Sequence, residues 1–178
     1  MIKRSAHSIL RVRAAKPALS FRAVNRRGTR GFQAGLQRHH LLPRQLLKQN
    51  CFGRMFDNIG RQAIGFEDFR VNGLLLPSRE STSIRTGLPL HRGPHRFYNE
   101  MVIARVGRIE SAWSRTRHLH PEEADETALF RLALVQKSLR KTLLNQPRRV
   151  LLNRKDPVGT GFDFTDLDAM ADTLWNAV

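Results

Sequence analysis

The chain has a single cysteine, Cys51, among its 178 residues, and this scarcity excludes several kinds of site. One thiol cannot form an intramolecular disulfide and cannot build a cysteine-rich zinc site. We expect Cys51 to be a core thiol on a helix. Long apolar runs are also missing. No stretch approaches the roughly 20 residues needed to cross a bilayer, so we expect no membrane insertion.

Acidic residues are absent from the first third of the chain. Residues 1–56 carry 13 Lys and Arg with no Asp or Glu, residues 57–120 carry 10 against 6, and residues 121–178 carry 8 against 9. The formal net charge is +16. A surface this basic attracts polyanions and releases counterions when it neutralises phosphates, so nucleic acid is the favoured partner. For residues 1–30 taken alone, a solvated tail or a targeting segment is the alternative.

Length and composition favour one modest domain with extensions. The chain is 40% hydrophobic, which is enough for a packed core. Residues 25–31 are rich in Arg and Gly and predict a flexible linker, so we expect the folded part to begin near Phe32. The sequence therefore divides into a basic flexible segment at residues 1–30, a core at residues 31–120 and a helical extension at residues 121–178.

Apolar residues at helical spacing predict three amphipathic helices. The first follows Pro43 and the third begins at Pro121. The second is expected to begin at Pro94, with His91 just before it and His95 in its first turn. The expected buried stripes are Leu47, Cys51, Met55 and Ile59 in the first helix, Tyr98, Val102, Val106, Ile109 and Trp113 in the second, and Ala128, Leu132, Val135, Leu139 and Leu143 in the third.

Two shorter elements are expected as well. Residues 71–76 contain a turn-forming Asn-Gly pair followed by three Leu, which predicts a short strand leaving a tight turn. Asn72 is placed to hold that loop through its side-chain amide. Residues 146–161 are rich in Pro, Arg and Gly and predict a loop, and Thr165 with Asp168 resembles the cap of a final short helix.

Four of the seven His lie in two short motifs. His39 and His40 are adjacent, and 52 residues after His39 the segment 91–95 reads His-Arg-Gly-Pro-His. Imidazole is a common ligand for zinc, nickel and related ions, so three rings can hold a divalent metal while the fourth acts as a base. Adjacent strand residues point to opposite faces, so His39 and His40 are not expected to share one role. The remaining His are expected on the surface: His7, His118 and His120.

The order of motifs across residues 35–110 resembles one nuclease family. Residues 39–43 read HHxxP, residues 72–77 read NGxxLP, and residues 91–98 read HxGxHxxY. Together these motifs closely resemble the AHH family, a branch of the HNH and endonuclease VII superfamily. One position departs from the family pattern, because the small residue before the two His is here Arg38.

The resemblance implies a mainly helical α+β fold with an HNH-like ββα-metal core, a short β-hairpin and flanking helices. Colicin-type DNases of the same superfamily also carry HH followed by HxxxH. By this resemblance His39, His91 and His95 bind one divalent metal ion, and His40 is the catalytic base. The metal stays open among Zn²⁺, Ni²⁺, Mg²⁺ and Mn²⁺, although an all-His set favours the softer ions in binding.

Other residues near the motifs are assigned supporting roles. By the resemblance, Asn72 helps to hold the His-bearing loop. Tyr98 either positions a phosphate through its hydroxyl or only packs the helix. Four Arg flank the His motifs and are candidates for phosphate contacts, although each taken singly is more often a solvated surface residue: Arg38, Arg44, Arg92 and Arg96.

The sequence therefore predicts a metal-dependent endonuclease, with DNA the favoured substrate and RNA the alternative. The family resemblance further implies a bacterial toxin or effector with an acidic immunity protein as its partner. The competing interpretation is a non-catalytic basic nucleic-acid-binding protein with a structural zinc site. Because Arg11 and Arg13 interrupt the N-terminal apolar residues, we expect no secretory signal, and hence a cytoplasmic protein or one exported by a dedicated system. Organellar targeting by residues 1–30 is a further alternative.

Overall fold

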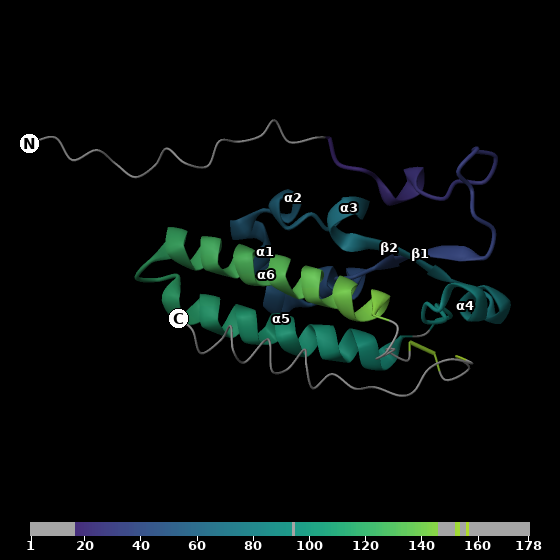
Figure 1. The fold of residues 1–178 in the computed structure, drawn as a ribbon. Helices are drawn as coiled ribbons and strands as arrows, with labels where there is room; N and C mark the ends of the chain where they lie inside the picture. Colours follow the sequence, from purple (N-terminus) through teal and green to yellow (C-terminus); the bar gives the residue numbers. More distant parts are fainter. Residues whose placement is uncertain (1–16, 94, 146–151, 154–155, 157–178) are drawn as a thin grey trace, which may run out of the picture.

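The computed structural model describes residues 17–93, 95–145, 152–153 and 156 (Figure 1). Most of the loop expected at residues 146–161, the final helix expected after Thr165, and His7 lie outside the described residues.

Helices dominate the described fold, and two strands form its only sheet there. In Figure 1, helices α5 and α6 run side by side, and the two strands lie beyond one end of the helices. Helix α1 packs against both α5 and α6. In chain order the elements are η1 (Phe21–Ala23), β1 (Leu36–His40), η2 (Arg44–Lys48), α1 (Asn50–Ile59), α2 (Arg61–Ile64), α3 (Phe69–Asn72), β2 (Gly73–Pro77), α4 (Glu80–Thr86), α5 (Arg96–Thr116) and α6 (Pro121–Leu144).

The expected mainly helical α+β fold is confirmed. Strands β1 and β2 pair antiparallel, with His39 opposite Leu74 and His40 opposite Gly73. The two strands are not joined by a tight turn, because residues 41–72 between them form η2, α1, α2 and α3. The Asn-Gly pair therefore lies at the junction of α3 and β2. Gly73 is required there, since a Cβ atom would collide with the ring of Phe69.

Both long helices bury the stripes that the sequence predicted. All five expected residues of α5 and all five of α6 are buried in one continuous core. Helix α6 begins with Pro121 at its N-terminus and carries Glu122 and Glu123 in its first turn, where acids interact favourably with the helix dipole. The second helix begins at Arg96, two residues later than expected, so His95 is its N-cap and not a residue of its first turn. Pro94 lies outside the described residues.

The first predicted helix is wrong in its start and in one residue of its buried face, since Met55 is buried and Leu47 and Ile59 pack partly buried against the core. The residues after Pro43 form a 3₁₀ turn, and α1 begins only at Asn50. Helix α1 buries a stripe formed by Phe52, Met55 and Phe56, whereas Cys51 lies at the edge of that stripe and is exposed. The prediction of a core thiol is therefore wrong. Gly60 caps the C-terminus of the helix.

The folded part begins earlier than the expected Phe32. Ser20 forms an isolated β-bridge with Asp68, and the backbone N–H of Leu19 donates to the Asp68 carboxylate at 3.1 Å. Phe21 is buried against Phe69, with 5.1 Å between ring centroids. Residues 19–21 therefore contact the core through pairing with the distant residues 68 and 69, which the composition did not reveal. The division of the chain into three segments stays a prediction.

None of the helices within the described ranges is both long enough and apolar enough to span a bilayer.

Candidate metal centre

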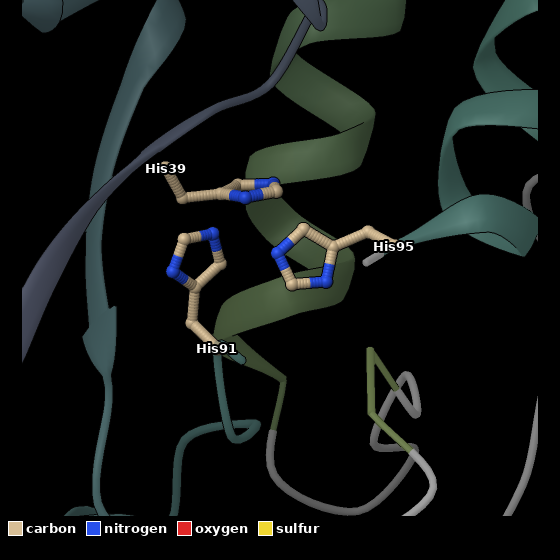
Figure 2. Close-up of side chains that lie close together, drawn as sticks. All are labelled: His39, His91 and His95. Atoms are coloured by element: carbon tan, nitrogen blue, oxygen red, sulfur yellow. The ribbon is translucent and has the colours of Figure 1, made fainter. Parts of the chain in front are cut away.

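Three His side chains from separate parts of the chain converge beside the sheet. His39 comes from β1, His91 from the segment after α4, and His95 from the N-terminus of α5. One ring nitrogen from each lies within 4.8 Å of the others, and Figure 2 shows the three rings facing a common centre. His39 is buried, whereas His91 and His95 are half-buried. We refer to these three residues as the His trio.

Hydrogen bonds orient two of these rings. Nδ1 of His91 lies 3.3 Å from Oε1 of Gln37, and Nδ1 of His95 lies 3.3 Å from the carbonyl oxygen of Leu152. A carbonyl oxygen only accepts, so Nδ1 of each ring carries the proton and donates it. The Nε2 lone pairs of both rings are then available to a ligand. Oxygen acceptors behind a metal-binding His commonly fix the ring in this way.

His39 presents a buried nitrogen without a partner. Its Nε2 is enclosed and makes no hydrogen bond within the described part of the chain. Unpaired buried polar atoms are costly, so such an atom calls for an explanation such as an ion that the site binds. The rings of Tyr98 and His91 are steeply inclined to the His39 ring, at 64° and 79°, with centroids 4.9 and 4.8 Å away.

The electrostatics of the His trio favours neutral imidazole. Burial lowers the pKa of His39 well below its usual value, and the nearby His91 and His95 lower it further. Burial, followed by the charges of His95 and His40, lowers the pKa of His91 to about 4. Burial also lowers the pKa of His95, against a smaller opposite effect of its bond to Leu152. All three rings are therefore neutral at physiological pH, which is the form that binds a metal.

His40 points to the other face of β1, where Phe21 covers it. The two rings are stacked, with centroids 3.7 Å apart and planes 5° from parallel. Nε2 of His40 is enclosed and has no partner among the described residues. Burial lowers the pKa of His40, while Glu67 raises it, and Arg44 and then Arg38 lower it further.

Asn72, at the start of the NGxxLP motif, joins this motif to the segment that follows His39 and His40. Its side-chain oxygen accepts from the N–H of Leu42 at 2.7 Å, and its amide donates to the carbonyls of Leu42 and Phe66 at 3.1 Å each. Gln136 of α6 donates to the same Asn72 oxygen at 3.4 Å. Asn72 is fully buried, so these bonds tie the segment after His39 and His40 to the start of β2.

Tyr98 also supports the segment that follows the two His. Its hydroxyl donates to the carbonyl of Leu41 at 2.8 Å, and the side chain is only 1% exposed. Burial raises the pKa of the Tyr98 hydroxyl, so the group stays protonated. Of the two roles that the sequence left open, this geometry favours packing, because the hydroxyl is occupied and faces away from solvent.

The four candidate phosphate-binding Arg are all exposed, and each has a neighbour. Arg38 donates from Nη1 to the carbonyl of Phe21 at 2.8 Å. Three others lie near single carboxylates: Arg44 is 3.8 Å from Glu67, Arg92 is 3.7 Å from Glu80, and Arg96 is 4.0 Å from Glu100. Exposed pairs this long are weak, so these three side chains stay available to other anions.

Three residues of the site were not anticipated from the sequence: Gln37, Phe21 and Leu152. Gln37 lies two residues before His39, and strand alternation could have placed it on the same face. Phe21 and Leu152 are distant in the sequence from the residues they contact, and no local pattern signals either contact. His118 and His120, in contrast, are exposed as expected.

The donor set fits a divalent metal ion. Three neutral imidazoles, two of them with Nδ1 already bonded and the third with an enclosed, unpaired Nε2, suit zinc, nickel and similar ions. Within the described ranges these three His are the group of His, Cys, Asp and Glu side chains that could hold an ion.

The chain was also compared with known proteins. It matches the model of the AHH family, described as a nuclease family of the HNH/ENDO VII superfamily with conserved AHH, over residues 20–139. Comparisons with curated proteins and with solved structures gave no match. The family match covers about two thirds of the chain and contains all four motif His. As the order of the motifs predicted, the chain belongs to the AHH family of nucleases.

Proposed function

We propose that this nuclease is a metal-dependent endonuclease that hydrolyses phosphodiester bonds in DNA with little sequence preference. The observation that carries the proposal is the division of the His residues. His39, His91 and His95 converge with ring nitrogens within 4.8 Å, while His40 lies on the opposite face of β1 and is not part of that cluster.

The residues take distinct roles in this proposal. His39, His91 and His95 hold the ion, and Gln37 and the Leu152 carbonyl keep two of the rings in the ligating tautomer. When bound, a divalent ion in such a site supplies Lewis acidity that stabilises negative charge on a phosphoryl group and its leaving oxygen. His40 accepts a proton from the attacking water. Because Nε2 of His40 is enclosed, the surroundings of the Phe21–His40 stack must rearrange before water reaches this nitrogen.

The exposure of the His trio favours a catalytic ion over a structural one. Structural zinc sites are closed by four protein ligands, whereas catalytic sites keep a position open. Here the described residues supply three ligands, and two of these, His91 and His95, are only half-buried. This arrangement leaves room for a phosphate or a water beside the ion, so we favour the nuclease over a non-catalytic zinc-binding protein.

The charge distribution supports a nucleic-acid substrate. The net charge of +16 provides phosphate contacts that position a substrate without specifying bases. Arg38, Arg44, Arg92 and Arg96 are the proposed phosphate-binding residues next to the His motifs. RNA remains the alternative substrate, since a phosphodiester presents the same charge in both polymers.

The biological role is proposed by family analogy. AHH-type domains often form the toxic part of bacterial polymorphic toxins, so we propose a toxin or effector role and an acidic immunity protein as its partner. The basic N-terminal half is complementary in charge to such an inhibitor.

Plasmid cleavage by the purified chain tests the nuclease. We expect nicking with at least one of Zn²⁺, Ni²⁺, Mg²⁺ and Mn²⁺, and none with EDTA. Cleavage that persists in EDTA would contradict metal dependence. Absence of cleavage of both DNA and RNA with every ion would contradict the proposed nuclease, and a loss of fold on EDTA treatment would then identify a structural ion.

A further inference from the structure

A groove rich in arginine lies at the end of the sheet where β1 begins and β2 ends. It has a volume of about 790 Å³ and is lined by the residue 22–27 segment, the first residues of β1 and the residues after β2. No Asp or Glu lines it. We call it the arginine groove, and its polar lining includes Arg22, Arg26, Arg27, Arg38, Arg79 and Gln37.

The arginines of this groove are not neutralised by neighbouring carboxylates. In the described part of the chain no carboxylate lies within ion-pair distance of Arg22, Arg26, Arg27 or Arg79. The ion pairs found elsewhere in the molecule involve other arginines, such as Arg61 with Asp57. Like charges gathered in one concave surface raise the local concentration of anions, and guanidinium groups match the geometry of phosphate oxygens.

Asn25 holds the groove wall in a defined conformation. Its amide donates to the carbonyls of Gln33 and Leu36, at 3.1 and 3.0 Å, and its side-chain oxygen accepts from the N–H of Gln33 at 2.7 Å. The hydroxyl of Thr29 donates to the carbonyl of Arg26 at 2.7 Å. Arg26 and Arg27 are therefore presented by an ordered loop, and not by a free tail.

Gln37 connects the arginine groove with the metal centre. It lines the groove, and its Oε1 also lies 3.3 Å from Nδ1 of His91. Leu36, at the groove, is three residues before His39 on the same strand, a separation of about 10 Å at roughly 3.4 Å per residue. Phosphates of a DNA strand recur about every 3.4 Å along the helix axis, so a bound polymer reaches both places at once.

We infer that the arginine groove binds the phosphate backbone of the nucleic acid next to the phosphodiester that enters the His trio. This inference rests on the proposed function and deepens it, because it assigns substrate contacts to arginines outside the His motifs. Arg22, Arg26 and Arg27 grip the phosphates from one wall, and Arg79 grips them from the other.

Equilibrium binding by the full-length chain tests the arginine groove separately from cleavage. Every protein carries His40→Ala, so that the probe is not consumed, and Mn²⁺ is present. The groove variant replaces Arg22, Arg26 and Arg27 by Gln. The control replaces the exposed Arg54, Arg115 and Lys137 by Gln, and therefore loses the same charge from α1, α5 and α6. Fluorescence anisotropy of labelled DNA, single-stranded and duplex, and of RNA of the same sequence is measured across a range of salt concentrations.

The groove variant should bind about a hundredfold more weakly at physiological salt, and the slope of log affinity against log salt should fall by two to three, at about 0.7–0.9 per phosphate contact. The control variant should show a much smaller loss of affinity and a much smaller fall in the salt slope. Equal losses in the two variants, or an unchanged salt slope in the groove variant, would overturn the inference. Because the readout is binding, an absence of plasmid cleavage by the parent chain would contradict the proposed nuclease without deciding the role of the groove.

Discussion

The two faces of strand β1 differ in what covers them. One face carries His39 into a buried environment with His91, His95 and Tyr98 around it. On the other face His40 lies under Phe21, and the neighbouring Arg38 is exposed and bonds the Phe21 carbonyl. The strand alternation thus separates two identical adjacent residues, one into a ligand cluster and one outside it.

This difference suggests how one short strand serves two tasks. The His39 face is built from motifs that follow β1 in the sequence and from the carbonyl of Leu152. The His40 face is covered by Phe21, which precedes the strand, and the arginine groove lies at the end of the sheet, where both Gln37 and Arg38 line it. We infer that the first face holds an ion and that the second handles the water and the substrate backbone.

Removal of His39 disrupts the ligand cluster on the His39 face of β1 and should have the largest effect. His39→Ala deletes one of three proposed ligands, so metal affinity should fall by more than about a hundredfold, since even indirect partners of ligands contribute about 10–100-fold. Cleavage should be lost with it. Isothermal titration calorimetry with Zn²⁺ measures the affinity, and His118→Ala, at an exposed His outside the motifs, is the control. An unchanged affinity in His39→Ala would remove His39 from the ligand set.

Asn72→Ala should destabilise the structure on both faces of β1, because Asn72 holds the segment that follows His39 and His40. The variant leaves the buried N–H and carbonyl of Leu42 without their partner, and we expect a loss of about 3 kcal/mol in the free energy of unfolding. Asn99→Ala is the matched control, since the Asn99 amide donates to Gln45 at an exposed site. Urea unfolding measures both. Equal small losses would show that the buried bonds of Asn72 do not stabilise the fold.

Tyr98→Phe removes a hydroxyl on the His39 face of β1 and leaves the His40 face unchanged. The variant keeps the ring beside His39 and removes the bond to the Leu41 carbonyl, which should lower the free energy of unfolding by about 1–3 kcal/mol. Denaturant unfolding and plasmid cleavage are measured for Tyr98→Phe and for the parent. Together they separate the two roles proposed for Tyr98, packing of the helix and positioning of a phosphate. A cleavage loss much larger than the loss of folded protein would point instead to a hydroxyl that acts on the substrate.

Asp68→Asn should have the smallest effect and acts on the His40 face. The Asp68 carboxylate caps α3 and accepts from the N–H of Leu19, and its side-chain bond with Arg70 lowers its pKa. A lowered pKa in the folded state adds stability above the unfolded pKa, and this stability is lost as the pH falls through the folded pKa. At neutral pH the variant should lose less than about 1 kcal/mol, and the difference from the parent should vanish once Asp68 is protonated.

Urea unfolding at neutral and at acidic pH tests this pH dependence. Asp57→Asn is the control, because Asp57 forms a more exposed pair with Arg61. A difference between Asp68→Asn and the parent that grows on acidification would contradict the assigned sign.

The elements with long regular patterns were predictable from the sequence. The stripes of α5 and α6 repeat over several turns, and their periodicity determines which face packs, so all ten positions are buried as expected. The start and the buried face of α1 were less predictable, because four apolar residues at i+4 spacing do not reveal the 3₁₀ turn that precedes the helix. Cys51 is exposed because the buried stripe is centred on Phe52, Met55 and Phe56 instead.

The candidate site was predictable where the motifs are local and ordered. The sequence grouped His39 with His91 and His95, and these rings do converge in the structure. Their roles as ligands, and that of His40 as the base, stay predictions. The contacts of Phe21 with His40 and of Leu152 with His95 depend on tertiary packing across 19 and 57 residues, and no local pattern encodes such pairs.

The His40→Ala variant tests the division of roles most directly, with metal affinity and plasmid cleavage measured on the same preparation. Metal affinity should stay at the parental value, because His40 is outside the His trio, while the cleavage rate should fall by about 10²–10⁴-fold, the usual contribution of a general base. A variant that cuts DNA at near the parental rate, or that loses the metal, would contradict the separation of the two adjacent His.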